Sequence, residues 1–381
     1  MAFKMKSLQV QDFTLGQPIQ QDVYDNDAAL LLRKGFVIER FEQIEKIMMN
    51  GMNFMSIEEQ KTGDEEDGLH LYMQAPGLPP KFNPFRLWEH IRTKATDLLQ
   101  QISTKKGFPE KIQAIAALIQ LLSEKDADSG LGLMLRAENA RYATAHTVHV
   151  ALIVELVARR MGWPVEQRKS AVCAALTMNV GMTELYAELF HQRGPLTQEQ
   201  KTGIIEHPHT GHALLKAAGV QDEAWLTAVL QHHEVHDGKG YPHKLQEVSQ
   251  MAELLRMADI FCAKVSPRAY RKPIPAGRVI KDMFAEEGRA GKNPIPAMFI
   301  KEIGLFPPGS FVQLANEETA IVVRRGQSPT TPIVFSLLSD TNMRYIEPHR
   351  RDTAHKDFAI ASVVPCEKIT VRIDAPRLWG Y

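Results

Sequence analysis

The 381-residue sequence is poor in cysteine, has no excess of charge of either sign and contains no long apolar run. Its cysteines, Cys173, Cys262 and Cys366, lie far apart and are odd in number, which excludes a disulfide framework and a CxxC zinc ribbon. Lys and Arg total 45 and Asp and Glu total 45, so the chain lacks the basic excess of a general DNA or membrane-surface binder. No run of about 18 apolar residues occurs, and the start has no apolar signal segment. We expect a reduced, cytoplasmic, globular protein without a membrane span.

Composition shifts along the chain predict four segments. Residues 1–60 combine strand-like patches at 8–13 and 18–24 with a helix at 40–49, which indicates a small α+β module of regulatory type. Acidic residues with Pro and Gly make residues 61–84 a linker. Helical periodicity then dominates residues 85–305, and short β-branched runs make residues 306–381 a β-rich extension. The fold class is therefore mainly α.

Helix and strand limits follow from local signals. Asn83 before Pro84, Thr197 and Asp222 are the expected N-caps of three helices. The expected helices cover residues 85–104, 110–123, 137–161, 166–177, 198–217, 222–233 and 250–264, and the expected strands cover residues 311–314, 319–324, 333–338 and 368–373.

Histidine is the residue with the most uneven distribution. Ten of the 14 histidines lie between His146 and His243, about a quarter of the chain. Imidazole is a common metal ligand and acid–base group, so the cluster indicates a site of one of these kinds. Four members are expected to serve other roles: His149 in the core, and at the surface or beside the site His209, His212 and His236.

The densest motif, HHEVHDGKGYP, runs from His232 to Pro242. It follows a helix expected to carry Trp225 and Val229 inward, so His233 continues the buried face. Adjacent helical residues point about 100° apart, so the two imidazoles can converge only near the frayed helix end. The glycines that follow allow backbone with positive φ to approach closely. A plain core helix needs neither these glycines nor the acids, which favours a metal site.

The motif resembles HHExxDGxGYP, the signature of the HD-GYP family of cyclic di-GMP phosphodiesterases within the HD superfamily of metal-dependent phosphohydrolases. All eight fixed positions match in order and spacing. The resemblance implies a helical HD-superfamily bundle over residues 85–305. The resemblance extends over residues 137–304, where further segments match the family pattern. These are His146-Thr147 with Val150-Ala151, His207-Pro208 with Gly211, and Ala258-Asp259 with Phe261, Arg268, Tyr270 and Arg271.

One segment departs from the family pattern. Where the family has Leu-Leu-His-Asp-Ile-Gly-Lys, residues 176–182 read Leu-Thr-Met-Asn-Val-Gly-Met. By alignment, Met178 replaces a histidine ligand, Asn179 replaces the bridging aspartate and Met182 replaces the lysine. A neutral amide coordinates only through its carbonyl, and a thioether suits Cu(I) better than iron or manganese. No catalytic residue is therefore assigned.

The resemblance also implies a divalent transition metal, iron or manganese, with one ion or none in place of two. Three of the retained histidines, His207, His232 and His233, could bind one ion together from one side. For nucleotide phosphates the resemblance favours Arg268 and Arg271, with Lys239 and Tyr241 as further contacts; an exposed basic surface is the alternative, and Lys239 is left open between them. The implied metal ligands are His146, His207, His232, His233 and Asp259.

Three hypotheses about function follow. The first is a bacterial cyclic di-GMP signalling protein with a degenerate phosphodiesterase site, which binds cyclic di-GMP, a related nucleotide or a partner with weak or no hydrolysis. The second is an active metal-dependent cyclic di-GMP phosphodiesterase with a rearranged site, in which Glu184, His191 or Asp259 replaces the lost ligands. The third is a protein-binding module whose loop from Gly238 to Pro242 docks a GGDEF-domain protein.

Overall fold

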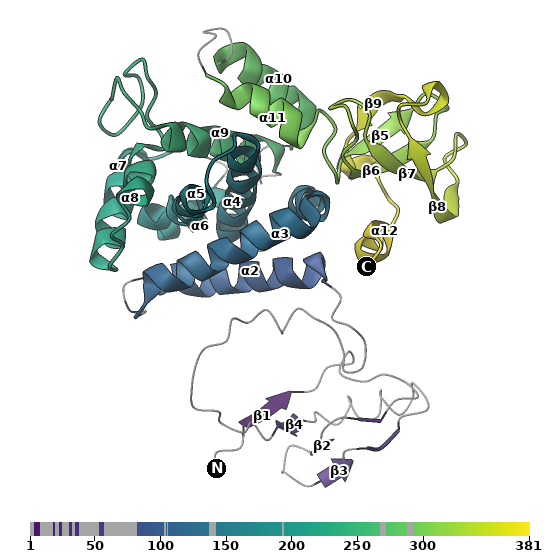
Figure 1. Cartoon of the computed structure of the whole chain (residues 1–381), viewed down its shortest axis with the longest axis horizontal. Helices are drawn as coiled ribbons and strands as arrows, with labels where there is room; N and C mark the ends of the chain where they lie inside the picture. Colours follow the sequence, from purple (N-terminus) through teal and green to yellow (C-terminus); the bar gives the residue numbers. More distant parts are fainter. Residues whose placement is uncertain are drawn as a thin grey trace. The chain divides into compact units, whose positions relative to one another are not determined.

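The structure is a computed structural model, and it divides the chain into two compact units, residues 1–68 and 69–381 (Figure 1). The N-terminal unit contains an antiparallel sheet in the order β1-β4-β2-β3. Its strands are β1 (Lys4–Ser7), β2 (Val23–Tyr24), β3 (Leu30–Leu32) and β4 (Asn53–Ser56). The described residues are 4–7, 18–19, 23–24, 30–32, 35–37, 53–56, 82–102, 104, 106–136, 142–192, 194–266, 272–287 and 293–381.

Two predictions for this unit fall outside the described residues. These are the strand at 8–13 and the helix at 40–49. The strand predicted at 18–24 is described in part, because Val23–Tyr24 forms β2 and Pro18 makes an isolated bridge to Val37.

The second unit is mainly helical, with a small antiparallel sheet at its C-terminal end, as predicted. Among the described residues, no helix has the length and apolar character needed to cross a membrane. The helices are α2 (Pro84–Leu99), α3 (Phe108–Arg136), α4 (Tyr142–Arg160), α5 (Val165–Thr177), α6 (Thr183–His191), α7 (Gln198–Ala217), α8 (Glu223–Gln231), α9 (Gln250–Val265), α10 (Ala276–Glu287) and α11 (Ile295–Ile303).

The predicted caps are confirmed. Asn83 accepts hydrogen bonds from the first N–H groups of α2, and the Asp222 carboxylate accepts one from the backbone of Trp225. Thr197 and Gln200 form a reciprocal capping box at the start of α7. Each cap satisfies backbone donors that a helix start leaves unpaired, which is why the helices begin at these residues.

Helix α4 lies at the centre of the core (Figure 1). Its residues from Val148 to Ala158 are buried on every side, apolar except for His149 and Glu155, because α2, α3, α5, α9 and α11 all pack around it. This central position fixes His146, near the start of α4, against the surrounding helices.

The predicted helix at 110–123 is wrong at its C-terminal end, because α3 continues to Arg136. A kink at Asp126, with φ of −158° and ψ of 80°, separates its two halves. The Asp126 carboxylate accepts hydrogen bonds from Ser129 and from the Tyr381 hydroxyl, so it acts as a cap inside the helix.

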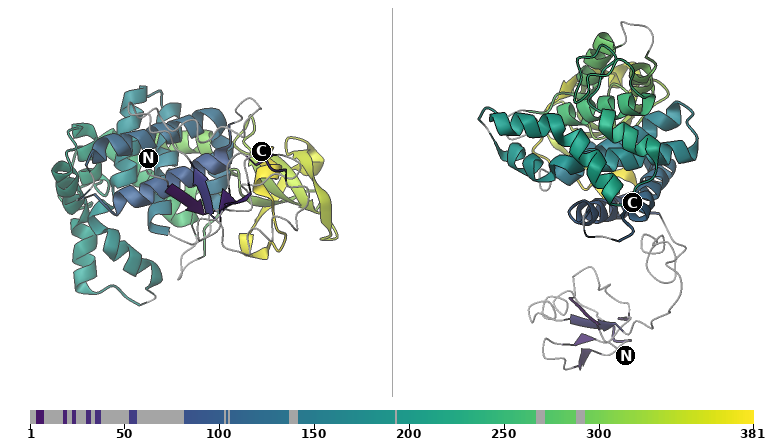
Figure 2. Two further views of the ribbon diagram at one scale, coloured as in Figure 1. Left: turned by 90° about the horizontal axis from the view of Figure 1, so that it is seen from below. Right: turned by 90° about the vertical axis from the view of Figure 1, so that its left-hand side faces the viewer.

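The C-terminal sheet has the order β8-β7-β6-β5-β9, and Figure 2 shows it beside the helices. Strands β5 (Phe311–Leu314), β6 (Thr319–Arg324) and β7 (Ile333–Leu338) are confirmed with the predicted limits. The strand predicted at 368–373 is wrong, since that stretch is irregular and packs its isoleucines and valine on a small core with Trp379. The sheet is instead completed by β8 (Arg344–Asp352) and β9 (Ile360–Val364), and the chain ends in α12 (Ala375–Trp379).

Candidate metal centre

Three histidine side chains meet where α7 passes the end of α8. His207 lies in the middle of α7, His232 is the C-cap of α8, and His233 follows it. One ring nitrogen of each lies within 4.8 Å of the others. The convergence predicted for the two adjacent histidines is therefore found at the helix end. We call these three residues the histidine triad.

Hydrogen bonds within the triad determine which ring nitrogens carry protons. Nδ1 of His207 lies 2.7 Å from the carbonyl oxygen of Ile204, and Nδ1 of His232 lies 2.6 Å from that of Val229. A carbonyl oxygen only accepts, so both Nδ1 atoms are the donors of neutral rings. Both Nε2 atoms are then unprotonated, although they face each other at 3.1 Å. Facing lone pairs are favourable only beside a cation, so the pair has the arrangement of metal ligands.

Burial keeps the triad uncharged. It lowers the pKa of His207 to about 3, with a further contribution from neighbouring His232. Burial also lowers the pKa of His232, and it holds the pKa of His233 well below the usual range. Neutral imidazole is the form that binds a metal, so the triad is ready for coordination at neutral pH.

The other two implied ligands form a separate pair. Nε2 of His146 on α4 lies 2.6 Å from Oδ1 of Asp259 on α9. Burial works to raise the pKa of Asp259, but the hydrogen bond and charge of His146, together with the nearby triad histidines, hold it well below its usual range. The negative charge of Asp259 partly opposes the lowering of the pKa of His207, His232 and His233 by burial. The carboxylate is therefore close enough to interact electrostatically with the triad.

The segment that departs from the HD-GYP pattern packs directly on α7. Buried Met178 ends α5, half-buried Asn179 follows, and residues Val180–Met182 form a 3-10 turn, η3. A Cβ atom on Gly181 would lie 2.2 Å from the His207 carbonyl oxygen and 2.6 Å from the Gly211 nitrogen. The turn therefore touches the α7 backbone at the level of the triad.

The loop after the triad folds back over it. Tyr241 stacks on the His233 ring at 4.5 Å, and its backbone N–H donates to the His233 carbonyl. A Cβ atom on Gly240 would lie 2.5–2.7 Å from the backbone of residues 233–235, so only glycine fits there. The fully buried Glu234 carboxylate accepts three backbone N–H groups, from His243, Lys244 and Leu245, at 2.6–3.1 Å.

The structure describes only some of the remaining predicted residues. Lys239 is 82% exposed and pairs with Asp237 at 2.7 Å. Arg268 and Arg271 lie outside the described residues, as does the side chain of His191. Glu184 and His209 are exposed. Of the other histidines, His149 is buried and stacks on Trp88, as expected for a core residue, His212 is half-buried, and His236 at the surface pairs with Glu253.

Comparison with known proteins identifies this arrangement. Residues 132–291, which hold the triad, the His146–Asp259 pair and the loop over them, match the HD domain family. These residues form an HD domain, and their retained motifs resemble the HD-GYP family.

Curated relatives of this HD-domain protein include the cyclic di-GMP phosphodiesterase PA4108 of Pseudomonas aeruginosa, 26% identical over 66% of this chain and 58% of the relative. Another is the cyclic di-GMP phosphodiesterase response regulator RpfG of Xanthomonas campestris, 24% identical over 52% of this chain and 55% of the relative. The chain thus spans little more than half the length of these relatives. Among solved structures, the HDG"Y"P protein Bd1817 of Bdellovibrio bacteriovorus is 17% identical, with a TM-score of 0.48 over 77% of this chain and 97% of that one.

Membership of a metal-dependent HD family implies a divalent metal, and the histidine triad fits one. It offers neutral imidazole nitrogens, which first-row divalent ions accept. The backbone carbonyls behind His207 and His232 supply the outer hydrogen bonds typical of metal-ligating histidines. A bound ion would supply Lewis-acid chemistry toward a phosphate oxygen at this centre.

Two features of the HD-GYP site were missed from sequence. The first is Glu234, whose carboxylate holds the loop over the triad. It lies within the motif directly after a helix end, and an acidic residue at that place was the signal that could have indicated this role. Tyr186 on α6 stacks against the His146 ring at 6.0 Å, and no local pattern marks it. The role of Glu234 could have been inferred from the motif, whereas the position of Tyr186 depends on tertiary packing.

Proposed function

We propose that the protein is a cyclic di-GMP signalling protein whose HD-GYP site is degenerate. It binds cyclic di-GMP, a related nucleotide or a partner protein, with weak or no hydrolysis. The observation that carries the proposal is the contact between Gly181 and the backbone of His207. That contact supports the alignment in which Met178 and Asn179 occupy the His-Asp positions beside a retained triad.

The chemistry of these substitutions argues against efficient hydrolysis. Two-metal hydrolysis of a phosphodiester needs cations about 3.5–4 Å apart. A bridging carboxylate offsets their repulsion, whereas the Asn179 amide is neutral and the Met178 thioether is a poor ligand for hard divalent ions. Replacement of the family lysine by Met182 removes a charge that would face phosphate. The triad is then left to hold one ion, iron or manganese, or none.

Nucleotide binding would use residues outside the triad. We assign phosphate contacts to Arg268 and Arg271, whose guanidinium forks match phosphate oxygens. Tyr241, on the face of His233, offers an aromatic surface at the same place. Lys239 is exposed enough to reach a ligand, once released from Asp237.

The architecture proposed around this site has four parts. Residues 1–60 form a regulatory α+β module and residues 61–84 a linker. Residues 85–305 form the helical HD-GYP domain, and residues 306–381 form the β-rich extension. We place this protein in the bacterial cytoplasm, where cyclic dinucleotides act.

Turnover and metal content test the proposal. Purified protein supplied with Mn²⁺ or Fe²⁺ should hydrolyse cyclic di-GMP much more slowly than about 1 s⁻¹, and a rate at or above that value would overturn the proposal. Anaerobically prepared protein should contain at most one iron or manganese per chain.

One observation favours an active enzyme with a rearranged site as the second candidate. Asp259 lies in electrostatic reach of the triad, so its carboxylate is the described group best placed to replace the lost bridge. Two metals per chain together with turnover would establish that candidate. Calorimetry with cyclic di-GMP separates both from a purely protein-binding module that docks a GGDEF-domain protein, because that module predicts no nucleotide binding.

A further inference from the structure

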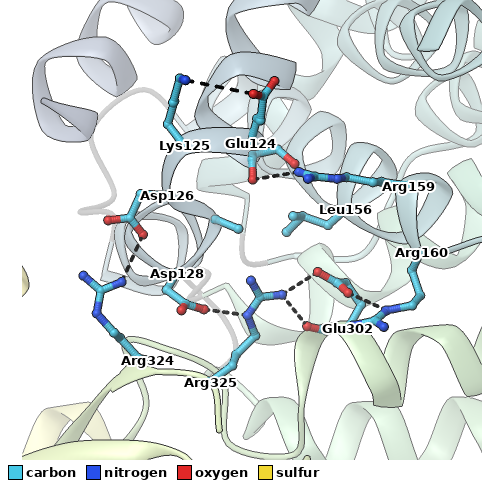
Figure 3. Close-up of a pocket in the computed structure, with 12 residues that line it drawn as sticks. Glu124, Lys125, Asp126, Asp128, Leu156, Arg159, Arg160, Glu302, Arg324 and Arg325 are labelled. Atoms are coloured by element: carbon cyan, nitrogen blue, oxygen red, sulfur yellow. Dashed lines mark hydrogen bonds and ion pairs between the residues drawn. The ribbon is translucent and has the colours of Figure 1, made fainter. Parts of the chain in front are cut away.

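A polar pocket lies at the junction of the helices and the C-terminal sheet (Figure 3). Its volume is about 530 Å³, within the range of sites for small ligands. Arg159, at the end of α4, is 13 residues from His146, or about 20 Å along the helix. The pocket is therefore far from the His146–Asp259 pair, and no residue of the histidine triad lines it. We call it the arginine pocket; the residues that carry the argument are Ser123, Asp126, Asp128, Arg159, Arg324 and Arg325.

Cations outnumber acids in the arginine pocket. Five basic and four acidic side chains line it. Arg325 is neutralised, because it contacts Asp128 and Glu302 at 2.5 Å each, and Arg160 pairs with Glu302 at 2.7 Å. The other two arginines of the pocket are Arg159 and Arg324, and their charges are less fully paired.

Arg159 feels the charge of Glu155, one turn earlier on α4, but forms no ion pair with it. Its Nη1 donates a hydrogen bond of 3.2 Å to the carbonyl oxygen of Ser123. No carboxylate of the described residues lies within ion-pair distance of it. A guanidinium has five N–H donors in a planar fork, so most of the binding capacity of Arg159 is unused.

Arg324 is only loosely paired. Its nearest carboxylate, on Asp126, is 3.7 Å away and already accepts hydrogen bonds from Ser129 and Tyr381. The Arg324 side chain is 49% exposed, so it can turn toward a ligand. Figure 3 shows Arg324 and Arg159 approaching the pocket from different elements.

A buried hydroxyl adds to this donor set. Ser123 lines the arginine pocket, is 3% exposed, and its Oγ has no hydrogen-bond partner among the residues that the structure describes. Asp128, which also lines the pocket, is mostly buried, and burial raises its pKa in spite of its pairing with Arg325. Charge-assisted hydrogen bonds are stronger in such surroundings than in water.

We propose that the arginine pocket binds the phosphate group of a small phosphorylated molecule, up to the size of a mononucleotide. Arg159 and Arg324 hold the phosphate oxygens, and the Ser123 hydroxyl donates to one of them. Guanidinium forks match phosphate geometry, and the one positive charge that the four acids of the pocket leave over favours an anion.

Calorimetry on the full chain tests this site with inorganic phosphate and with adenosine and guanosine 5′-monophosphates as probes. Arg159→Gln and Arg324→Gln should each weaken binding of the best probe about 10- to 150-fold. The matched control is Arg278→Gln, since Arg278 is 77% exposed on α10 and has only a 4.0 Å contact to Asp282; its affinity should be unchanged. Tighter binding of a nucleotide than of phosphate identifies a nucleotide as the occupant, and equal binding identifies free phosphate.

Two further variants keep the result unambiguous. Arg159→Lys retains the charge and should recover part of the affinity, which a purely structural role of Arg159 in holding Ser123 does not predict. His207→Ala should leave this binding unchanged, so failure of the proposed function at the triad does not affect it. Absence of binding at millimolar probe, or equal affinity in both glutamine variants and the parent, overturns the proposal.

Discussion

Nε2 of His207 lies 3.1 Å from Nε2 of His232, and each ring is held from behind by a carbonyl of its own helix. Because α7 and α8 fix both rings independently, the two nitrogens cannot move apart without breaking a helix-bound hydrogen bond. The pair is thus preorganised for a shared cation, and this relationship leads to the first prediction.

Substitution of either His207 or His233 by alanine should weaken metal binding by at least about tenfold, because loss of a ligand costs more than loss of its outer partner. The helical fold should remain, since neither ring makes the core of the bundle. Metal content by elemental analysis and circular dichroism give the two readouts. His209→Ala is the control, because His209 is an exposed histidine two residues along the same helix. Unchanged metal content in both ligand variants contradicts the assignment.

Restoring the family residues should rebuild a second metal position. The triple variant Met178→His, Asn179→Asp and Met182→Lys should bind about one extra metal per chain and hydrolyse cyclic di-GMP faster than the parent. Gains should be strongly non-additive, since a bridging carboxylate has little use without its flanking ligand. Asn179→Asp alone should raise metal affinity and give little turnover.

The control for this experiment is Met161→His, a methionine in the turn after α4 and outside the segment. It should add no metal. If the folded triple variant holds no more iron or manganese than the parent, the degenerate-site proposal is wrong.

The buried ring of His149 should make the protein sensitive to acid. Burial lowers its pKa to about 3, whereas the unfolded chain titrates near 6.5, so the unfolded state binds more protons below pH 6.5. Stability should therefore fall as the pH drops from 6.5 toward 3, by up to about 1.4 kcal/mol per pH unit from this residue. His149→Phe, which keeps the stack on Trp88, should reduce the loss between pH 7.5 and 5.5 in urea unfolding.

In that comparison the triad histidines titrate equally in both proteins, so the difference isolates His149. An identical pH dependence of the parent and the phenylalanine variant contradicts the prediction. His355→Phe serves as the control, because His355 is 65% exposed in the C-terminal sheet region.

Glu234 should be needed to hold the loop over the triad. Glu234→Ala removes the acceptor of three backbone N–H groups and should lower the free energy of unfolding by about 2 kcal/mol. Glu234→Gln keeps one oxygen and should lose about half as much. Protease cleavage within residues 243–247 should increase in the same order, with exposed Glu247→Ala as the unaffected control. Resistance equal to the parent in the alanine variant would falsify the clamp.

Local signals carried most of the predicted architecture. Strands β5, β6 and β7 and helix α7 have the predicted limits because alternating β-branched residues and a capping box act within a few residues. Convergence of His232 and His233 at the helix end also followed from helical geometry alone. The approach of His207 to them is tertiary, and only the family resemblance indicated it.

Elements held by distant partners could not be predicted. Most residues of strand β8 are polar. Arg351 on this strand donates two hydrogen bonds to Glu318, the residue before β6, and these bonds help to attach β8 to the sheet. The kink at Asp126 depends on the hydroxyl of Tyr381, the last residue of the chain. The stretch 368–373 has a strand-like sequence, but the edge beside β5 is taken by β9. No window of local sequence contains these pairings.

Gly181 lies so close to the His207 carbonyl that the packing of the two segments depends on the backbone and not on a reactive side chain. A missing side chain, and not a particular functional group, lets η3 rest on α7, so this backbone contact does not itself use the side chains at positions 179 and 182. If the proposed function holds, a few substitutions in this segment separate a hydrolase from a binding protein, and in either form Gly181 has to stay a glycine.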